Sequence, residues 1–239
     1  MTDTDDARRT AYSRFGNGVL ADTVLDRLPP GGAILDVGCA SGGLLALAKG
    51  RASRLAGLEI NPAAADAARS VTDEVVVAAL DGRMTSPEAW DGAFDVVVCG
   101  DVLEHLAEPA AGLRVATRWC KPGGVVVVSV PNVAHWRSRV QLARGRWRYE
   151  DTGLLDRTHL HFFTRETVVD LVRDGGLVVE DIVAVVPALR NHVRGMGRLP
   201  TRATQAVERT WQAWGRRRPG LLGYQVVVVG RRPQSTTGP

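Results

Sequence analysis

The sequence is poor in cysteine and has no long apolar segment. Its three cysteines, Cys39, Cys99 and Cys120, lack the C-x-x-C spacing of metal sites, and each lies in or beside an apolar run. We therefore expect reduced core thiols rather than disulfides or a structural metal ion. Apolar runs such as VVVV at 125–128 are far shorter than the roughly 20 residues of a membrane span. No transmembrane helix and no membrane partner are expected.

Lysine and aromatic residues are also scarce. Only Lys49 and Lys121 are lysines, so the net charge of +4 comes almost wholly from arginine. Arginines gather at 137–148 and again at 190–218. Each zone fits either a solvated helix face or a basic rim that attracts an anionic partner. Patterns in which aromatic residues are interleaved with basic ones for base stacking are absent, so nucleic-acid binding is not expected.

The amino-terminal stretch MTDTDDARRT is acidic and polar. It lacks the basic-then-apolar order of a secretory signal, which predicts a cytoplasmic protein. With 239 residues the chain is long enough for one well-buried domain and too short for two domains of average size. The sequence leaves open whether that domain is a monomer or a homodimer.

Apolar runs of strand length alternate with stretches of helical spacing. The runs are found at 33–38, 55–60, 74–79, 94–100 and 124–131. They are apolar on both sides, as a parallel sheet covered by helices on both faces requires. Helices are expected at about 11–28, at 61–70, where Asn61 caps and Pro62 fills the first turn, and at 109–119. The alternation predicts a doubly wound, Rossmann-like α/β domain.

The pattern changes after Pro131. Residues 132–149 predict a basic helix with a loop, and 150–163 predict a polar and aromatic irregular stretch. A helix is expected at 164–174, capped by Thr164, although Thr167 in place of glutamate leaves the capping box incomplete. Two late apolar runs predict strands that pair as an antiparallel hairpin at the edge of the sheet; they lie at 177–186 and 223–230.

The stretch ILDVGCASGG at 34–43 joins a strand to closely spaced glycines. In the dinucleotide fingerprint G-x-G-x-x-G, the middle glycine lets the backbone approach a pyrophosphate. Here Ala40 holds that position, while Gly38 and Gly42 can provide sharp turns on either side of it. The loop therefore fits a ligand that has no phosphate at this point.

Carboxylates follow the ends of the next strands, where open α/β sheets bind their ligands. Glu59 can accept both hydroxyls of a ribose, and Asp81 can accept a hydrogen bond from an adenine amino group. Asp36 and Asp101, the second of them in the run GDVLEHL, would flank a positively charged part of the ligand. A ligand with adenosine at one end, positive charge at the other and no phosphate is S-adenosyl-L-methionine.

In order along residues 33–132, these motifs resemble those of class I S-adenosylmethionine-dependent methyltransferases. ILDVGCASGG resembles the first motif, LEINP the ribose acid, FDVVVCGDVLEHL the fourth-strand motif and KPGGVVVVSVPN the entry to the fifth strand. The resemblance implies a seven-stranded, mostly parallel sheet with an antiparallel last strand. The predicted cofactor-binding residues are Asp36, Gly38, Cys39, Ala40, Gly42, Glu59, Ile60, Asp81, Gly82, Gly100, Asp101 and Leu103.

Residues 131–167 are similar to one subgroup of bacterial methyltransferases, akin to the methionine-biosynthesis-associated and ubiquinone-type enzymes. We expect a single methyltransferase domain over 1–232, and the polar composition of the last residues predicts a disordered tail at 233–239. The segments 132–163 and 187–220 would form a lid over a small-molecule acceptor, which the arginines favour as anionic or carrier-tethered. O-methylation is favoured over N- or C-methylation, in a natural-product, glycan or similar biosynthetic pathway.

Two histidines are candidates for the general base that an acceptor hydroxyl needs. His135 follows the fifth strand, in the loop expected to overhang the methyl group, and His159 would face the same side as His161 in an extended stretch. Imidazole titrates near the working pH, and Asp156 could orient His159. Alternatively, the pair His159 and His161 only buttresses the loop. His105 is expected to pack near the cofactor, and no metal ion is needed, although the cluster at 156–161 could host one.

Two other functions compete with methyl transfer. A nicotinamide-dependent oxidoreductase shares the order of strand, loop and acid, but Ala40, Asp81 and the GDVLEHL run argue against it. A partner subunit that binds the cofactor without catalysis is the second alternative.

Overall fold

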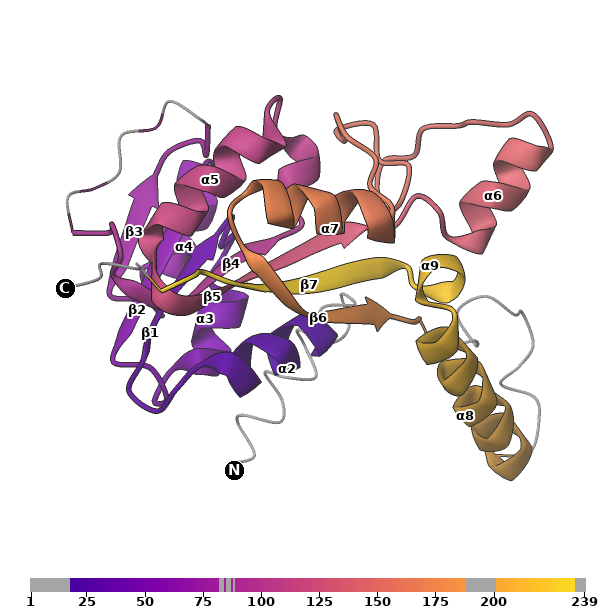
Figure 1. The fold of residues 1–239 in the computed structure, drawn as a ribbon, viewed down its shortest axis with the longest axis horizontal. Coiled ribbons are helices and arrows are strands. Elements are labelled where there is room, and N and C mark those ends of the chain that lie inside the picture. Colours follow the sequence, from indigo (N-terminus) through magenta and orange to yellow (C-terminus); the bar gives the residue numbers. More distant parts are fainter. Residues whose placement is uncertain (1–17, 82–83, 85–86, 88, 188–200, 235–239) are drawn as a thin grey trace.

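The computed structural model describes residues 18–81, 84, 87, 89–187 and 201–234. They form a seven-stranded sheet in the order β3-β2-β1-β4-β5-β7-β6 (Figure 1). The first five strands are parallel, and β7 is antiparallel to both of its neighbours. The strands are β1 Ala33–Val37, β2 Arg54–Glu59, β3 Glu74–Val77, β4 Phe94–Gly100, β5 Cys120–Pro131, β6 Val178–Val185 and β7 Gln225–Arg231.

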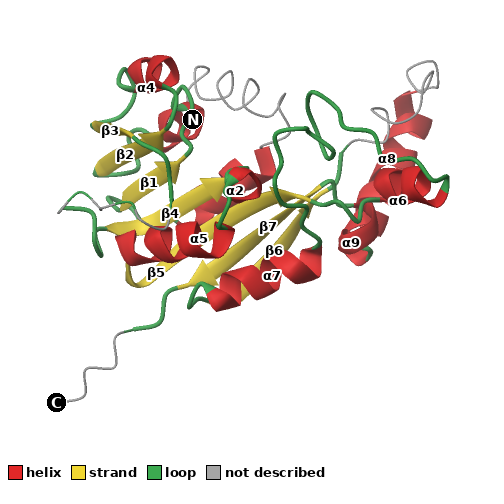
Figure 2. Ribbon diagram, turned by 90° about the horizontal axis from the view of Figure 1, so that it is seen from above, coloured by secondary structure: helices red, strands yellow, loops and turns green. Residues whose placement is uncertain are grey.

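Helices cover both faces of this sheet (Figure 2). On one face α5 and α7 share a buried core with Leu35 and Val37 of β1, and on the other α2 and α3 share a core with Ile34. Successive side chains of one strand thus enter different cores, which confirms the prediction of a two-sided sheet. The helices are α2 Gly18–Arg27, α3 Gly43–Ala48, α4 Pro62–Ala68, η1 Leu103–His105, α5 Pro109–Trp119, α6 Trp136–Ala143, α7 Arg165–Asp174, α8 Thr201–Arg217 and α9 Pro219–Leu222.

The two late strands pair antiparallel at one edge of the sheet, as predicted. Strand β7 lies between β5 and β6, so β6 alone forms the edge. The reason is in the side chains: Val226 to Val229 are all at most 1% exposed, whereas Val178 of β6 is 60% exposed. A strand that is apolar on both faces is buried best when it has a neighbour on each side.

Helix caps follow local chemistry. Asn61 Oδ1 accepts hydrogen bonds from the backbone N–H groups of Ala63 at 3.0 Å and Ala64 at 3.4 Å, as predicted for α4. At α7 the expectation of an incomplete capping box was wrong. Thr164 N–H donates to Thr167 Oγ1 at 2.9 Å, and Thr167 N–H donates to Thr164 Oγ1 at 3.2 Å. A threonine hydroxyl here does what a glutamate carboxylate usually does.

All three cysteines are buried free thiols, as predicted. Among the described residues, no helix is long and apolar enough to cross a membrane. The start of the predicted first helix at 11–17, the segment 188–200 and the tail at 235–239 lie outside the described residues.

Candidate cofactor and acceptor site

A cleft of about 390 Å³ opens where β1 to β4 end, at the edge of the sheet that the sequence predicted. Its size is in the range usual for small-molecule sites. Gly38, Glu59, Ile60 and Asp101, four of the predicted cofactor residues, lie on its wall. The complete lining consists of Val37, Gly38, Leu58, Glu59, Ile60, Ala78, Ala79, Leu80, Asp101, Val102, His105 and Leu106.

The loop after β1 is built from alternate left-handed residues. Gly38, Ala40 and Gly42 have φ values of 73°, 47° and 80°. A Cβ atom at Gly38 would lie 2.4 Å from Val102 Cγ2, so this position has no room for a side chain. Ala40 carries its methyl group in a conformation that L-residues seldom adopt. Its N–H donates to Glu59 Oε2 at 2.8 Å, which ties the loop to the end of β2.

Glu59 is the central acceptor of this end of the cleft. Its side chain is 8% exposed, and its second oxygen accepts the N–H of Asn61 at 2.8 Å. Each carboxylate oxygen has two acceptor sites, so Glu59 can hold the loop and still accept the hydroxyls of a ribose. The donor set therefore fits the nucleoside part of S-adenosylmethionine.

Two further carboxylates belong to β1 and to the residue that follows β4. Burial, helped by the negative charge of Glu59, raises the pKa of Asp36 to about 7. Burial also raises the pKa of Asp101 to about 6. Hydrogen bonds to its carboxylate from Gln225 Nε2, at 2.9 and 2.8 Å, and from Ser129 Oγ, at 3.3 Å, act in the opposite direction and lower the pKa. Poorly solvated carboxylates are stabilised by a nearby cation. The ammonium and sulfonium groups of S-adenosylmethionine suit such carboxylates; of the two, Asp101 lines the cleft and Asp36 is not among the lining residues.

The remaining predicted cofactor residues support the cleft or lie beside it. Cys39 packs against β2, where a Cβ at Gly57 would lie 2.6 Å from its Sγ. Leu103 is fully buried, and Gly100 lies against Leu20 of α2. Asp81 is exposed and follows the lining residue Leu80 in the chain, while Gly82 lies outside the described residues.

His135 lies apart from the described residues that line the cleft. It caps α6, with Nδ1 accepting the N–H of Arg137 at 3.4 Å. Its ring is 0% exposed and packs edge-on against Tyr224, with centroids 5.6 Å apart. This position supports the base of α6, so His159, which contacts the lining residue His105, is the better placed of the two predicted bases.

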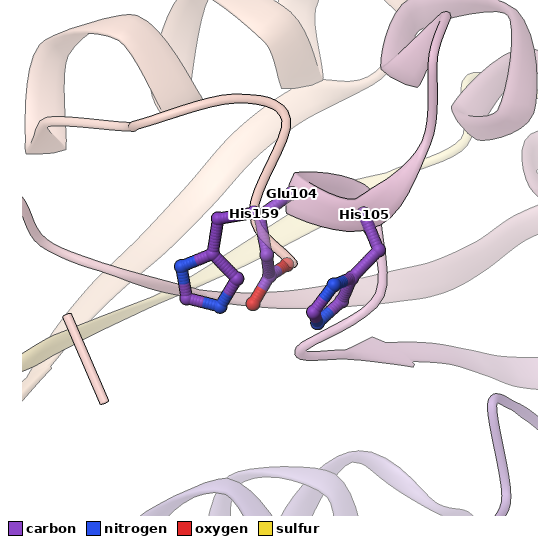
Figure 3. A group of neighbouring side chains, drawn as sticks. All are labelled: Glu104, His105 and His159. Atoms are coloured by element: carbon purple, nitrogen blue, oxygen red, sulfur yellow. The ribbon is translucent and has the colours of Figure 1, made fainter. Parts of the chain in front are cut away.

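His159 lies against the segment that follows β4. Its ring centroid is 4.9 Å from that of His105, which lines the cleft. Figure 3 shows the Glu104 carboxylate lying between these two rings. The ring of His161 contacts the same segment, through a 3.2 Å hydrogen bond from Nε2 to the carbonyl of Ala107. Asp156, predicted to orient His159, instead accepts from Thr158 N–H at 2.8 Å and Thr158 Oγ1 at 2.7 Å.

Glu104 is the site residue that the sequence analysis missed. Its side chain is 1% exposed, and burial, with the charge of Asp101 as a second cause, raises its pKa to about 8. Apart from its own backbone N–H, no described group donates a hydrogen bond to its carboxylate. Burial and the neighbouring His105 in turn lower the pKa of His159. The available signal was an acid beside a histidine, directly after a strand that carries a ligand site.

Comparisons with known proteins agree with this geometry. A family model described as a methyltransferase domain matches residues 12–182. The ubiquinone biosynthesis O-methyltransferase of Alkalilimnicola ehrlichii is 38% identical over 106 residues, which are 43% of this chain and 42% of that protein. The protein of the same name from Xanthomonas axonopodis pv. citri is 31% identical over 183 residues, 70% of this chain and 71% of that one. The chain thus spans less than half the length of the first relative.

Among solved structures, an S-adenosylmethionine-dependent methyltransferase from Archaeoglobus fulgidus matches 95% of this chain and 94% of its own, with a TM-score of 0.59 and 15% identity. At that identity the likeness shows the fold alone, and the fold is the Rossmann-like sheet that the sequence predicted. Because the family model covers more than half of the chain, this protein belongs to the methyltransferase-domain family of class I S-adenosylmethionine-dependent methyltransferases.

Proposed function

We propose that this protein transfers a methyl group from S-adenosylmethionine to an oxygen atom of a small, hydroxylated aromatic acceptor. The step would belong to a natural-product, glycan or similar biosynthetic pathway. The observation that carries the proposal is the cleft itself, in which Gly38, Glu59 and Asp101 fit the cofactor and His105 adjoins a second group of polar side chains. The two relatives named above as O-methyltransferases favour oxygen as the methylated atom.

When bound, S-adenosylmethionine supplies an electrophilic methyl group on a positively charged sulfur. The residues of this chain then have three tasks. The loop at Gly38 and the carboxylate of Glu59 hold the nucleoside, Asp36 and Asp101 offset positive charge, and the walls exclude water. The acceptor hydroxyl must also lose its proton, and we place that activation at Glu104, His105 and His159.

Aromatic side chains beside His159 indicate the class of acceptor. The ring of Phe162 lies 6.2 Å from that of His159, 5.3 Å from Trp147 and 6.3 Å from Tyr149. Flat rings of this kind favour an acceptor that is itself aromatic. They belong to the segment 132–163, which we propose as a lid. Its helix α6 and the later helix α8 project from the same end of the sheet (Figure 1).

Ligand binding tests the cofactor first. We expect S-adenosylhomocysteine to raise the melting temperature of the purified protein, and a nicotinamide dinucleotide to leave it unchanged. Glu59→Gln should lower the affinity for S-adenosylhomocysteine by roughly 10- to 100-fold, because a hydrogen bond to a charged group contributes about 1.5–3 kcal/mol. Glu166→Gln is the matched control, since Glu166 is an exposed acid in the first turn of α7.

Turnover then tests the reaction. Catechols, hydroxybenzoates and hydroquinones are offered with labelled S-adenosylmethionine, and the methylated atom is identified by mass spectrometry and NMR. Methylation on oxygen supports the proposal. Stabilisation by the nicotinamide dinucleotide alone would identify the oxidoreductase, and tight S-adenosylhomocysteine binding without any methylation would favour the partner subunit.

A further inference from the structure

We propose that Glu104, His105 and His159 bind a divalent transition-metal ion at the acceptor side of the cleft. Resting on the proposed function, we further infer that this ion holds the acceptor's hydroxyl oxygen. One potential ligand atom from each of the three side chains lies within 4.8 Å of the other two. In Figure 3 the carboxylate of Glu104 stands between the imidazole rings of His105 and His159.

The carboxylate of Glu104 is the first observation that points to a cation. It is almost completely buried, and no other described residue donates a hydrogen bond to it. Buried polar groups in folded proteins are nearly always paired, and a buried charge needs a partner even more. A metal ion held between Glu104 and the two histidines would supply that partner.

The second observation is the way in which the histidines are held. His105 Nδ1 donates to the carbonyl of Thr158 at 3.2 Å, which leaves the Nε2 lone pair available. The ring of His159 has a backbone hydrogen bond of its own, with Leu154. Metal-binding histidines usually donate their other ring N–H to a carbonyl or carboxylate, because this fixes the tautomer and the ring orientation.

The third observation is how the two segments are joined. The carbonyl of Glu104 accepts the N–H of Leu160 at 2.8 Å and that of His161 at 3.1 Å. The loop that carries His159 is therefore fastened to the 3-10 helix η1 that carries the other two side chains. Ligands that come from separate segments need such a fixed arrangement to form a site before the ion arrives.

The set of two imidazoles and one carboxylate indicates the kind of ion. Mg²⁺ and Ca²⁺ prefer oxygen ligands, whereas Zn²⁺, Mn²⁺ and Fe²⁺ accept imidazole nitrogen. Three protein ligands leave positions open for water or for an acceptor. A hydroxyl on the ion would release its proton to solvent while oxygen keeps the electron pair, and His159 would then act as a ligand rather than as the base.

The proposal is tested on the full chain after removal of any affinity tag and treatment with EDTA. Zn²⁺ and Mn²⁺ binding is measured by calorimetry, and S-adenosylhomocysteine affinity is measured on the same samples. We expect about one ion per chain for the wild type. Glu104→Gln and His105→Asn should each lower the affinity for the ion by more than about tenfold. His105 is exposed, so its variant folds even if the change at Glu104 disturbs the core.

His161→Ala is the matched control, because His161 lies two residues from His159 in the same loop but contacts Ala107 instead. It should leave ion affinity within about twofold. The site is wrong if the wild type binds neither ion, or if His161→Ala loses as much affinity as His105→Asn. S-adenosylhomocysteine affinity separates the two proposals. If the protein binds S-adenosylhomocysteine but no ion, only the metal site is overturned. If it binds an ion at Glu104 but no S-adenosylhomocysteine, the methyltransferase activity is overturned.

Discussion

The two ends of the cleft differ in how their carboxylates are satisfied. At the end proposed to bind the cofactor, around Gly38 and Glu59, both oxygens of Glu59 accept backbone N–H groups, from Ala40 and Asn61. At the end proposed to bind the acceptor, around Glu104 and His105, no other described residue donates a hydrogen bond to the Glu104 carboxylate, although Glu104 is more deeply buried than Glu59. At the first end the carboxylate of Glu59 is already paired within the protein before a ligand binds. At the second end the carboxylate of Glu104 has no hydrogen bond from another described residue. We therefore expect substitutions to act in opposite ways at the two ends.

The largest effect is expected at Gly38. Gly38→Ala places a side chain against Val102 at a φ of 73°, so backbone strain and overpacking add to a cost of about 2–4 kcal/mol. We also expect S-adenosylhomocysteine binding to be lost. Gly31→Ala is the control, because Gly31 has a φ of 69° but nothing within 4 Å of its added Cβ. Equal destabilisation of the two variants by urea unfolding would mean that strain alone, and not the close approach of the loop to Val102, shapes this end.

The same substitution at two glutamates should have opposite signs. Glu59→Met removes the acceptor of two backbone N–H groups and should lower the free energy of unfolding by about 1–3 kcal/mol. Glu104→Met replaces an unpaired buried carboxyl by an apolar chain of similar length and should raise the ligand-free stability by about 1–2 kcal/mol. Both changes are to be measured by urea unfolding of the EDTA-treated protein.

Zn²⁺ extends this comparison. It should stabilise the wild type and Glu59→Met but not Glu104→Met, because only the last variant lacks a proposed ligand. If Glu104→Met instead destabilises the ligand-free protein, the carboxyl has a structural partner and the contrast between the two ends disappears.

The sequence predicted which residues meet beside Glu59 far better than which residues meet beside Glu104. Ala40, Glu59 and Asp101 lie within strand–loop units whose order along the chain fixes where they meet. The acceptor end joins η1 to a loop some 50 residues later, through backbone hydrogen bonds to the carbonyl of Glu104. No periodicity or spacing encodes such bonds.

His135 illustrates the same limit. Its place after the fifth strand was predicted correctly, but its burial against Tyr224 depends on tertiary packing. The order of the two late strands, with β7 inside the sheet and β6 at its edge, was not predicted for a similar reason. Pairing between strands far apart in sequence is decided by burial on both faces, and local patterns do not reveal it.

A smaller effect on stability is expected from pH, through the buried carboxyl groups. Asp36, which faces Glu59 and the thiols of Cys39 and Cys99, has its pKa raised by burial to about 7. The folded state then keeps a proton that the unfolded state releases, so stability falls as pH rises from about 4 to about 7 and is level above that range. The melting temperature of the ligand-free protein should fall by a few degrees between pH 5 and pH 8.

Asp36→Asn should flatten this slope without removing it, because the raised pKa of Asp101 and of Glu104 acts in the same direction. Saturating S-adenosylmethionine should also flatten it, since its positive charge favours the ionised carboxylates. A slope that Asp36→Asn leaves unchanged would place the titrating groups elsewhere.

The smallest effect concerns the turn that presents His159. The carboxylate of Asp156 accepts hydrogen bonds from the backbone and the hydroxyl of Thr158. Asp156→Ala should lower the free energy of unfolding by less than about 1 kcal/mol and lower the affinity for Zn²⁺ by only a few fold. Asp151→Ala removes an equally acidic side chain from the same loop, where Asp151 forms only an exposed ion pair with Arg157 at 2.7 Å. If local negative charge attracts the ion, both variants lower the affinity for Zn²⁺ by the same factor. If the turn geometry positions His159, only Asp156→Ala does so, and S-adenosylhomocysteine affinity stays constant in both, because neither acid contributes to the cofactor end.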